Sequence, residues 1–450
     1  MDNLFIILPA FIFTIALLVA IHEFGHFWVA RKLNVKVLRF SIGFGMPLFS
    51  FRGKKDNTEF VLAAIPLGGY VKMLDEREAD VPEDEVHRAF NRQSVYKRFA
   101  IVFAGPFINF VFAAFAFWLM FVMGVQGVKP IMGKLAPTSI SWESGLRSGD
   151  HIVAVDDNDT PTMSAVYEHL FEAFLDRSTA TITLNDQRKV HFDFSSMAQD
   201  VEPSELHKII GLTVQLPVED VIISEVTVDS PAAKAGIEAG DQIIAIDGQS
   251  IDHWRELVNA VIDRPGETIS VEILRNAQRS TLAVIIGSAK SANRTIGRIG
   301  VRPKSVSGLP KSMYSMHQYG IFAAIPKGIE KTWDLSVLTV KMLGRIVIGE
   351  ASIKNISGPI TIAEVAGQSA QLGIESFLRF LAIVSLSLGV INLLPIPMLD
   401  GGHLLFYIVE IVKGSPVSDM VQEIGLKIGV TLLVMLMSVA LYNDFARLLN

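Results

Sequence analysis

Four long apolar windows divide the chain, and the residues between them show the mixed polar and apolar pattern of soluble domains. The windows are residues 4–21, 99–125, 380–399 and 428–442. About 20 apolar residues cross a bilayer as a helix, so the last window must borrow from Ile424 onward, with Lys427 snorkelling or facing other helices. No basic region precedes the first window, which is therefore expected to be a retained span. The pattern predicts a multi-pass α-helical membrane protein with four spans.

Basic residues flank both ends of the polar segment 31–98. They are Arg31, Lys32, Lys36, Arg39, Lys97 and Arg98. Cytoplasmic loops are enriched in Lys and Arg, so this segment is predicted to be cytoplasmic. With four spans, both termini and the segment 126–379 then lie on the opposite face, which is the periplasm in a bacterium with an outer membrane. We therefore expect a protein of the bacterial inner membrane.

The long segment between the second and third windows contains an internal repeat. The stretch SGLRSGDHIVAVD (144–156) matches AGIEAGDQIIAID (235–247) at a constant offset of 91 residues. Each copy continues with an amphipathic helical pattern, near 164–174 and 253–263, and then with β-rich segments such as 179–184 and 268–274. A repeat of this length is a duplicated domain, longer than any solenoid unit.

The repeated pattern resembles tandem PDZ domains, so we expect two PDZ-like α+β domains at 126–217 and 218–308. The resemblance implies that such domains can bind an extended peptide by adding it as a strand to a sheet edge. A role as spacers or size filters that exclude bulky substrates stays open. After them, apolar residues recur at helical spacing from Ile321 to Ile346 with charges between. The segment 309–375 is therefore predicted to hold an amphipathic helix, on the outer membrane surface or packed against the repeated domains.

Composition excludes several classes of function. Hydrophobic residues make up 50% of the chain and charged residues only 19%, which agrees with membrane spans joined to soluble modules. The net charge of −6 and the lack of a Lys/Arg block give no sign of a surface for nucleic acid. The chain has no cysteine, which excludes disulfides and Cys-based metal sites.

The motif His22-Glu23-Phe24-Gly25-His26 follows the first window and indicates metal chemistry. Residues four apart share a helical face, so both imidazoles can reach one Zn²⁺ while Glu23 projects toward the metal-bound water. His22 lies about 27 Å along a helix from Leu4, near the cytoplasmic end of the span. Ionisable residues at membrane depth are costly, which favours a functional role over histidines that merely face water.

A catalytic zinc site usually has three protein ligands, so a third ligand must come from elsewhere in the chain. Asp400 and its rival His403 both lie in the segment NLLPIPMLDGGH (392–403), which closes the third window. The third span runs from outside to inside, so its end lies on the same side as His22 and His26. The topology therefore predicts that one of the two residues completes the site.

Polar and helix-breaking residues are expected around this site. Pro395 and Pro397 should break the third helix, which a membrane tolerates only where the backbone is buried in protein or lines a wet cavity. Asn392 is a candidate for substrate binding, with helix–helix attachment as the alternative. In the second span, Gly105 is expected to pack closely beside the site and Asn109 is a candidate partner of a metal ligand.

The cytoplasmic segment contains an apolar stretch, 60–70, that is too short to span and bears turn residues. It is predicted to form a re-entrant β-hairpin, with a plain loop on the membrane surface as the alternative. A hairpin edge can receive a substrate strand, which would expose a scissile bond that a helix keeps hydrogen-bonded.

The motif at 22–26, Leu399-Asp400-Gly401 and the two PDZ-like domains together resemble the site-2 protease family of intramembrane zinc metalloproteases, over nearly the whole chain. The resemblance implies that His22, His26 and Asp400 bind one Zn²⁺ per chain and that Glu23 is the catalytic base. It also implies substrates embedded in the lipid bilayer. These are a single-span anti-sigma factor already trimmed on its periplasmic side and remnant signal peptides.

The chain is thus expected to consist of nine consecutive segments. These are a first span (1–31), a cytoplasmic loop (32–98), a second span (99–125), two PDZ-like domains (126–217 and 218–308), an amphipathic segment (309–375), a third span (376–402), a cytoplasmic loop (403–423) and a fourth span (424–446). A transporter is the first alternative, although the spans show no inverted repeat. A non-catalytic scaffold with a structural metal site is the second, although such a site would not need Glu23.

Overall fold

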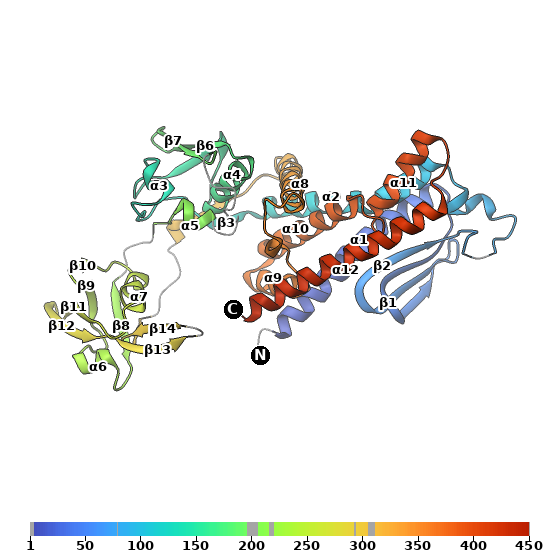
Figure 1. The fold of residues 1–450 in the computed structure, drawn as a ribbon. Helices are drawn as coiled ribbons and strands as arrows, with labels where there is room; N and C mark the ends of the chain where they lie inside the picture. Colours follow the sequence, from blue (N-terminus) through green and yellow to red (C-terminus); the bar gives the residue numbers. More distant parts are fainter. Residues whose placement is uncertain are drawn as a thin grey trace.

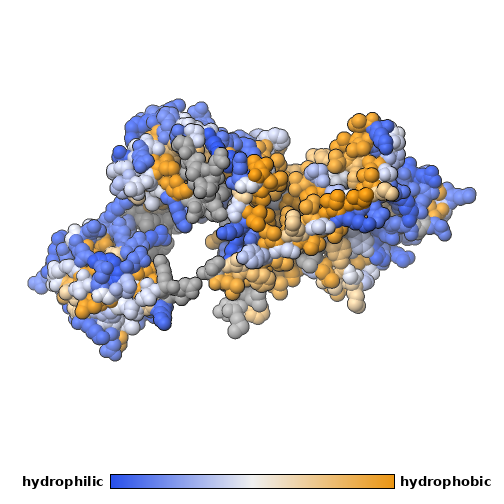
Figure 2. Space-filling model, viewed as in Figure 1, coloured by the Kyte–Doolittle hydropathy of each residue, from blue (hydrophilic) through white to orange (hydrophobic). Residues whose placement is uncertain are grey.

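A computed structural model describes residues 4–78, 80–195, 206–215, 220–291, 294–304 and 311–449. Within them, four helices are long and apolar enough to cross a membrane. They are α1 (Leu4–Lys32), α2 (Val95–Met123), α10 (Ile374–Leu393) and α12 (Asp419–Leu449). These helices form a bundle at one end of the molecule, and two modules of strands and short helices lie at the other (Figure 1). Apolar residues dominate the surface of the bundle and hydrophilic residues that of the modules (Figure 2).

Helix α2 is the centre of the bundle, because both α1 and α10 pack along it. Small residues allow the close approach. A side chain at Gly25 of α1 would overlap the carbonyl of Ala104 in α2, and one at Gly389 of α10 would crowd Pro106 and Phe110. Small residues at helix contacts are typical of membrane helices, whose association depends on close packing rather than on the hydrophobic effect.

The third apolar window does not form one continuous helix. Helix α10 ends at Leu393, a non-helical link covers residues 394–399, and Asp400 begins a new helix, α11 (Asp400–Lys413). Leu394, which precedes Pro395, is extended, as steric contact with a following proline requires. The expected break at Pro395 and Pro397 is therefore present, and α11 extends into the segment 403–423, which was expected to be a loop.

The fourth helix is longer than the short apolar window suggested. Helix α12 has 31 residues, and its first turns include an ion pair between Lys427 and Glu423 at 2.8 Å, four residues apart. It contacts the rest of the protein in its first half and near its C-terminal end. Gly429 packs against the backbone of Pro397, and Asp444 accepts hydrogen bonds from the backbone N–H groups of Gly358 and Ile360 at the start of α9 (Pro359–Leu372).

The segment between α1 and α2 contains a long hairpin, β1 (Val37–Arg52) and β2 (Glu59–Met73), whose strands both bend, so that Ser41 pairs with Val61 on one side and with Tyr70 on the other. Its turn is made by Asp56 and Asn57, which both have positive φ angles. The stretch 60–70 lies within β2 and reverses direction there, because Val61 and Tyr70 pair with opposite sides of Ser41. Gly68, in this bend, has a positive φ angle. Two short 3₁₀ turns, η1 (Val86–Arg88) and η2 (Phe90–Arg92), join the hairpin to α2.

Module 1 and module 2 are built from equivalent elements. Module 1 consists of α3 (Ile140–Glu143), β4 (Ile152–Val155), β5 (Asn158–Asp159), α4 (Met163–Asp176), β6 (Thr179–Leu184), β7 (Lys189–Asp193) and α5 (Leu206–Ile210). Module 2 consists of β8 (Val221–Val226), α6 (Pro231–Ala235), β9 (Gln242–Ile246), β10 (Gln249–Ser250), α7 (Trp254–Ile262), β11 (Thr268–Arg275), β12 (Gln278–Ile285), β13 (Gly287–Ser291), β14 (Arg294–Arg298) and β15 (Val301–Pro303).

The two modules share one strand arrangement. The sheet order is β5-β4-β6-β7 in module 1, and the equivalent β10, β9, β11 and β12 are neighbours in module 2. Helix α4 begins at Met163 and α7 at Trp254, which reproduces the offset of 91 residues. Each module has a separate buried apolar core.

Helix α8 (Ala324–Val347) connects module 1 with the bundle. Leu338 and Met342 pack on the core of module 1, whereas Leu335 and Leu343 pack on the cluster between α2 and α10. Trp333, on a third side, is 69% exposed. The expected amphipathic helix is thus present and packs against a module. The rest of this segment contains η4 (Lys311–Met313), β16 (Tyr314–His317) paired with β3 (Val125–Val128), η5 (Ile353–Asn355) and α9, which was not expected.

Candidate metal centre

The side chains of His22, His26 and Asp400 converge where the last turns of α1 meet the first residue of α11. The Oδ2 atom of Asp400 lies 3.1 Å from His22 Nε2 and 3.5 Å from His26 Nε2, and the two Nε2 atoms are 3.2 Å apart. Among the described residues, this is the group of His, Asp and Glu side chains arranged to hold a metal ion. The residues come from opposite ends of the sequence, and folding brings them together.

The geometry of these three residues fits a zinc ion. Zinc binds His nitrogen and carboxylate oxygen at about 2.0–2.1 Å with tetrahedral angles, which requires ligand atoms about 3.3 Å apart. The three observed separations, 3.1, 3.2 and 3.5 Å, surround that value. The Oδ2 atom of Asp400 is buried and has no hydrogen-bond partner, so a metal ion would satisfy it. The donor set of two imidazoles and one carboxylate is also one that zinc accepts.

Helix α2 orients both imidazoles. His26 Nδ1 lies 2.9 Å from the carbonyl oxygen of Ile101, so Nδ1 carries the proton and Nε2 is free to bind a metal. His22 Nδ1 lies 3.1 Å from Nδ2 of the fully buried Asn109, whose Oδ1 has no hydrogen-bond partner among the described residues. Metal binding through Nε2 requires a proton on Nδ1, and Oδ1 accepts this proton once the amide group is turned by 180°.

The glycine at position 105 makes room for the imidazoles. A Cβ atom at Gly105 would overlap the His26 ring and lie 2.9 Å from His22 Cε1. Ile101, Gly105 and Asn109 are spaced by four residues, so they share one face of α2. The expectation that Gly105 packs closely beside the site, and that Asn109 lies beside a ligand, agrees with these contacts.

Glu23 lies on α1 between the two histidines and is only 9% exposed. It is not a member of the ligand group that the described residues form. Strand β2 packs directly onto it, because a Cβ atom at Gly69 would lie 2.9 Å from Glu23 Cγ and 2.7 Å from the carbonyl oxygen of Ser41. The hairpin therefore passes beside the carboxylate that is expected to move protons.

Asp400 is held by the first turn of α11 and the link before it. Side chains at Gly401 and Gly402 would overlap the backbone of Leu393, Leu394 and Ile396, so the link folds back tightly on α11. As the first residue of a helix, the Asp400 carboxylate also faces the positive end of the helix dipole.

Two other predicted residues lie outside the ligand group. His403, the rival ligand, is one turn further along α11 and is exposed. Asn392, the substrate-binding candidate, lies in the last turn of α10 and is partly exposed. Sequence reasoning missed the carbonyl of Ile101 and the contact of Gly69 with Glu23. A backbone carbonyl leaves no trace in the residue type, and a glycine does not show which side chain it makes room for.

An apolar cavity of about 540 Å³ lies between α1, α2 and β1. Its lining includes Ile21 and Phe24, which flank the first metal-site residues, and Ile108, which precedes Asn109. The lining residues are Ala20, Ile21, Phe24, Phe40, Ile108, Val111, Phe112 and Phe115. The cavity offers space for apolar groups close to the polar site.

The chain is similar to known proteins over nearly its whole length. The model of the peptidase family M50 matches residues 10–436. The regulator of sigma-E protease RseP of Escherichia coli (strain K12) is 45% identical over 98% of both chains. A Vibrio cholerae protein with a provisional zinc metalloprotease name is 42% identical over 98% of both chains. Among solved structures, the PDZ domain of an SdrC-like protein from Listeria monocytogenes is 21% identical, with a TM-score of 0.18, and matches 20% of this chain and 94% of its own.

The four apolar helices and the family match define a membrane-embedded metalloendopeptidase. The chain belongs to peptidase family M50, the site-2 protease family, which it matches over nearly its full length. Zinc is the metal that this membership supports.

Proposed function

We propose that this protein cleaves single-span membrane proteins within or beside the bilayer, with one zinc ion held by His22, His26 and Asp400. The observation that carries the proposal is the triangle of their ligand atoms, 3.1–3.5 Å on a side, next to the buried Glu23. Zinc, when bound, supplies a Lewis acid that lowers the pKa of water and polarises a carbonyl group.

The chain's own residues supply the proton transfers and the orientation. Glu23 accepts a proton from the attacking water and returns it to the departing amine, as a general base and then a general acid. Asn109 and the carbonyl of Ile101 keep the Nδ1 protons of the two histidines in place. Burial of Glu23 under β2 keeps bulk water away from the carboxylate.

The proposed topology has four spans in the inner membrane, with both termini and the two modules in the periplasm and the site near the cytoplasmic side. The start of α1 and the end of α12 lie at the same end of the bundle, opposite α11 and the hairpin (Figure 1). An even number of spans produces this arrangement. Arg31 and Lys32 in the last turn of α1 favour a cytoplasmic position for the hairpin end.

The hairpin is proposed to receive the substrate as an added strand. β1 and β2 form a sheet of their own, with the end of β1 at one edge and the end of β2 at the other, and these two edges carry free backbone groups. Exposed apolar side chains on β1, among them Met46 and Leu48 at 79% and 70%, suit contact with lipid or with a membrane segment. An added strand would run beside Gly69 and Glu23. Asn392, at the end of α10, is proposed to hydrogen-bond the backbone of the same segment.

The proposed substrates are an anti-sigma factor already trimmed on its periplasmic side and remnant signal peptides. Support comes from the name of the Escherichia coli relative, a regulator of sigma-E protease. We extend this regulatory function to the present chain and propose that its cleavage is a step of the sigma-E envelope stress response. The two modules stand on the same side as the trimmed end and either bind it or exclude larger substrates.

The test compares the wild type with Glu23→Gln in detergent, using a trimmed single-span substrate and measuring bound zinc in both. We expect both proteins to hold about one zinc, while Glu23→Gln loses roughly 10²- to 10⁴-fold in turnover because it lacks the proton acceptor. Equal cleavage by both would mean that another base acts. Zinc in both without cleavage by either, over several trimmed substrates, would favour the scaffold with a structural metal.

A further inference from the structure

Helix α11 carries Asp400 but is fixed to the protein along only one side. Its buried residues are Gly401, Gly402, Leu404 and Tyr407. The opposite side, with Leu405, Ile408 and Val412, is exposed. Before α11 the chain is non-helical from 394 to 399, so no continuous helix transmits the position of α10 to Asp400. The place of Asp400 therefore depends on the folded link before it and on what holds the buried side of α11.

That side is held by the first turn of α2. The guanidinium of Arg98 donates a hydrogen bond from Nη2 to Glu410 Oε1 at 2.6 Å. Its central carbon lies 5.0 Å from the centre of the Tyr407 ring, within the range of a cation–π contact. Nε donates to the carbonyl oxygen of Gln93 at 3.2 Å, which ties the same group to the turn before α2. Arg98 thus contacts α11 at two residues and its own helix start at a third.

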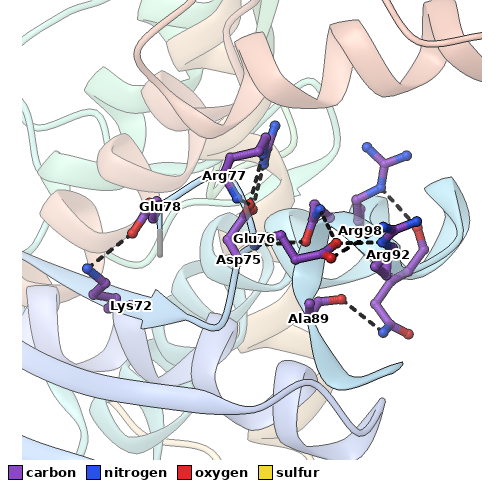
Figure 3. Close-up of polar contacts among 10 residues, drawn as sticks. Lys72, Asp75, Glu76, Arg77, Glu78, Ala89, Arg92 and Arg98 are labelled. Carbon is purple, nitrogen blue, oxygen red and sulfur yellow. Dashed lines mark hydrogen bonds and ion pairs between the residues drawn. The ribbon is translucent and has the colours of Figure 1, made fainter. Parts of the chain in front are cut away.

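The environment of this contact makes it more than a surface ion pair. The side chains of Arg98 and Glu410 are only 17% and 14% exposed. An ion pair at this depth is costly to break from one side, because the remaining charge is left without a partner. By contrast, Arg92, in the same segment, pairs with Glu76 and is 61% exposed (Figure 3).

The face of α2 that holds α11 also holds the histidines. Arg98, Ile101, Gly105 and Asn109 follow one another at intervals of three, four and four residues, so they lie along one side of the helix. Ile101 and Asn109 contact the imidazoles, and Arg98 contacts the helix that begins with Asp400. Tyr407 is seven residues, or two turns, from Asp400 and lies on the same side of α11.

We propose that Arg98, acting through Glu410 and Tyr407, is a positioning residue that holds α11 on α2 and so places Asp400 opposite His22 and His26. This proposal rests on the proposed function, because it takes these three residues as the zinc ligands. Arg98 touches neither the metal site nor substrate. Its effect is expected on zinc affinity and on turnover, and not on the KM for substrate.

The experiment uses full-length protein in detergent and measures the zinc dissociation constant by chelator competition, together with kcat and KM. The variants are Arg98→Met, Glu410→Met, both together, and Tyr407→Leu. Arg88→Met is the matched control, because Arg88 pairs with Asp56 at 2.8 Å with side chains 20% and 12% exposed, and this pair does not involve α11. His22→Ala tests the ligand assignment itself.

We expect each single change at 98 and 410 to weaken zinc binding roughly tenfold and to lower kcat at an unchanged KM, as loss of an outer partner of a metal site does. The double variant should recover at least part of the zinc affinity and of kcat, since two packed apolar side chains can replace a buried ion pair. Tyr407→Leu should lower zinc affinity and kcat in the same way but less. It leaves no unpaired charge, so it tests the contact even if Arg98→Met does not fold. Arg88→Met should leave them unchanged.

The positioning role is overturned if Arg98→Met and Tyr407→Leu keep the zinc affinity and kcat of the wild type. It is also overturned if Arg88→Met loses as much zinc affinity and kcat as they do, because the effect would then be general destabilisation. If His22→Ala binds zinc as tightly as the wild type, the ligand assignment fails instead, and the two failures are thereby distinguished.

Discussion

The two halves of the metal site are built in different ways. His22 and His26 stand four residues apart on α1, so a single helix is enough to place them side by side. Asp400 follows a proline-containing link and begins a separate helix, and it reaches the histidines only because α10 and α11 both pack on α2. One half of the site is thus encoded locally and the other by tertiary packing. The comparison predicts that distant parts of α2 matter more for Asp400 than for the histidines.

The largest effect is expected from removing a ligand in either half. Asp400→Ala should lose zinc as completely as His22→Ala, although the two residues belong to different helices. Activity should fall by about 10³-fold or more, because the metal supplies several kcal/mol of transition-state stabilisation. Zinc content after dialysis and cleavage of a single-span substrate measure the two quantities. Retention of zinc in Asp400→Ala alone would show that the tertiary half is dispensable, and His403→Ala would then be examined as the alternative ligand.

A smaller effect is expected at Asn109, which orients His22 from α2. Asn109→Ala should weaken zinc binding roughly 10- to 100-fold, the usual consequence of losing the partner of a metal-bound histidine. Asn109→Asp keeps an acceptor for the Nδ1 proton and should retain most of the affinity. Asn392→Ala is the contrast, because it should leave zinc affinity unchanged and raise the KM. The same chelator competition checks all three, and equal zinc binding by Asn109→Ala and wild type would remove Asn109 from the site.

The modules should be the part of the molecule whose perturbation affects the metal site least. In module 2, Arg275 donates two hydrogen bonds to Asp241, at 2.6 and 2.7 Å, and the backbone N–H of Glu238 donates a third at 2.8 Å. Burial, the largest single influence, acts to raise the pKa of Asp241, but these hydrogen bonds together hold it below its usual value of 3.8. The carboxylate is therefore stabilised in the folded module.

Because the folded pKa lies below the unfolded one, this stabilisation is complete above the unfolded pKa and is lost as the pH falls through the folded pKa. Asp241→Asn should lower the free energy of unfolding of module 2 by about 1.5–3 kcal/mol at pH 7, the range for hydrogen bonds to charged groups. The difference from wild type should shrink below about pH 4. Pulse proteolysis of the full chain at several pH values measures it, with Asp186→Asn, at a 54% exposed side chain, as control. A loss of zinc affinity in Asp241→Asn would contradict the independence of module and site.

The difference between local and tertiary encoding also explains which features were predictable. The length of the four apolar windows predicted four long helices. The repeat, with its offset of 91 residues, predicted two modules of equivalent structure. The motif at 22–26 predicted two neighbouring imidazoles. Asp400 could be named as a candidate because charge patterning placed its segment on the same side of the membrane.

Features that depend on contacts between distant segments were not predictable. The contact of Arg98 with Glu410 joins residues 312 positions apart, and no sequence pattern links the two. Helix α11 extends into the segment 403–423, which was expected to be a loop. This helix packs on α2, and the sequence pattern does not show that contact. The order in which the parts of β1 and β2 pair, with residues 39–42 between 59–62 and 69–72, also depends on contacts that the sequence pattern does not contain.

The most direct test of the central claim is zinc K-edge X-ray absorption on purified Glu23→Gln protein and on the same protein with Asp400→Ala. The account predicts two imidazole nitrogens and at least one carboxylate oxygen at about 2.0–2.2 Å in the first sample. In the second sample, any zinc that remains should have lost the carboxylate oxygen. Identical spectra from the two samples, with the same zinc content, would contradict the claim that Asp400 completes the metal site.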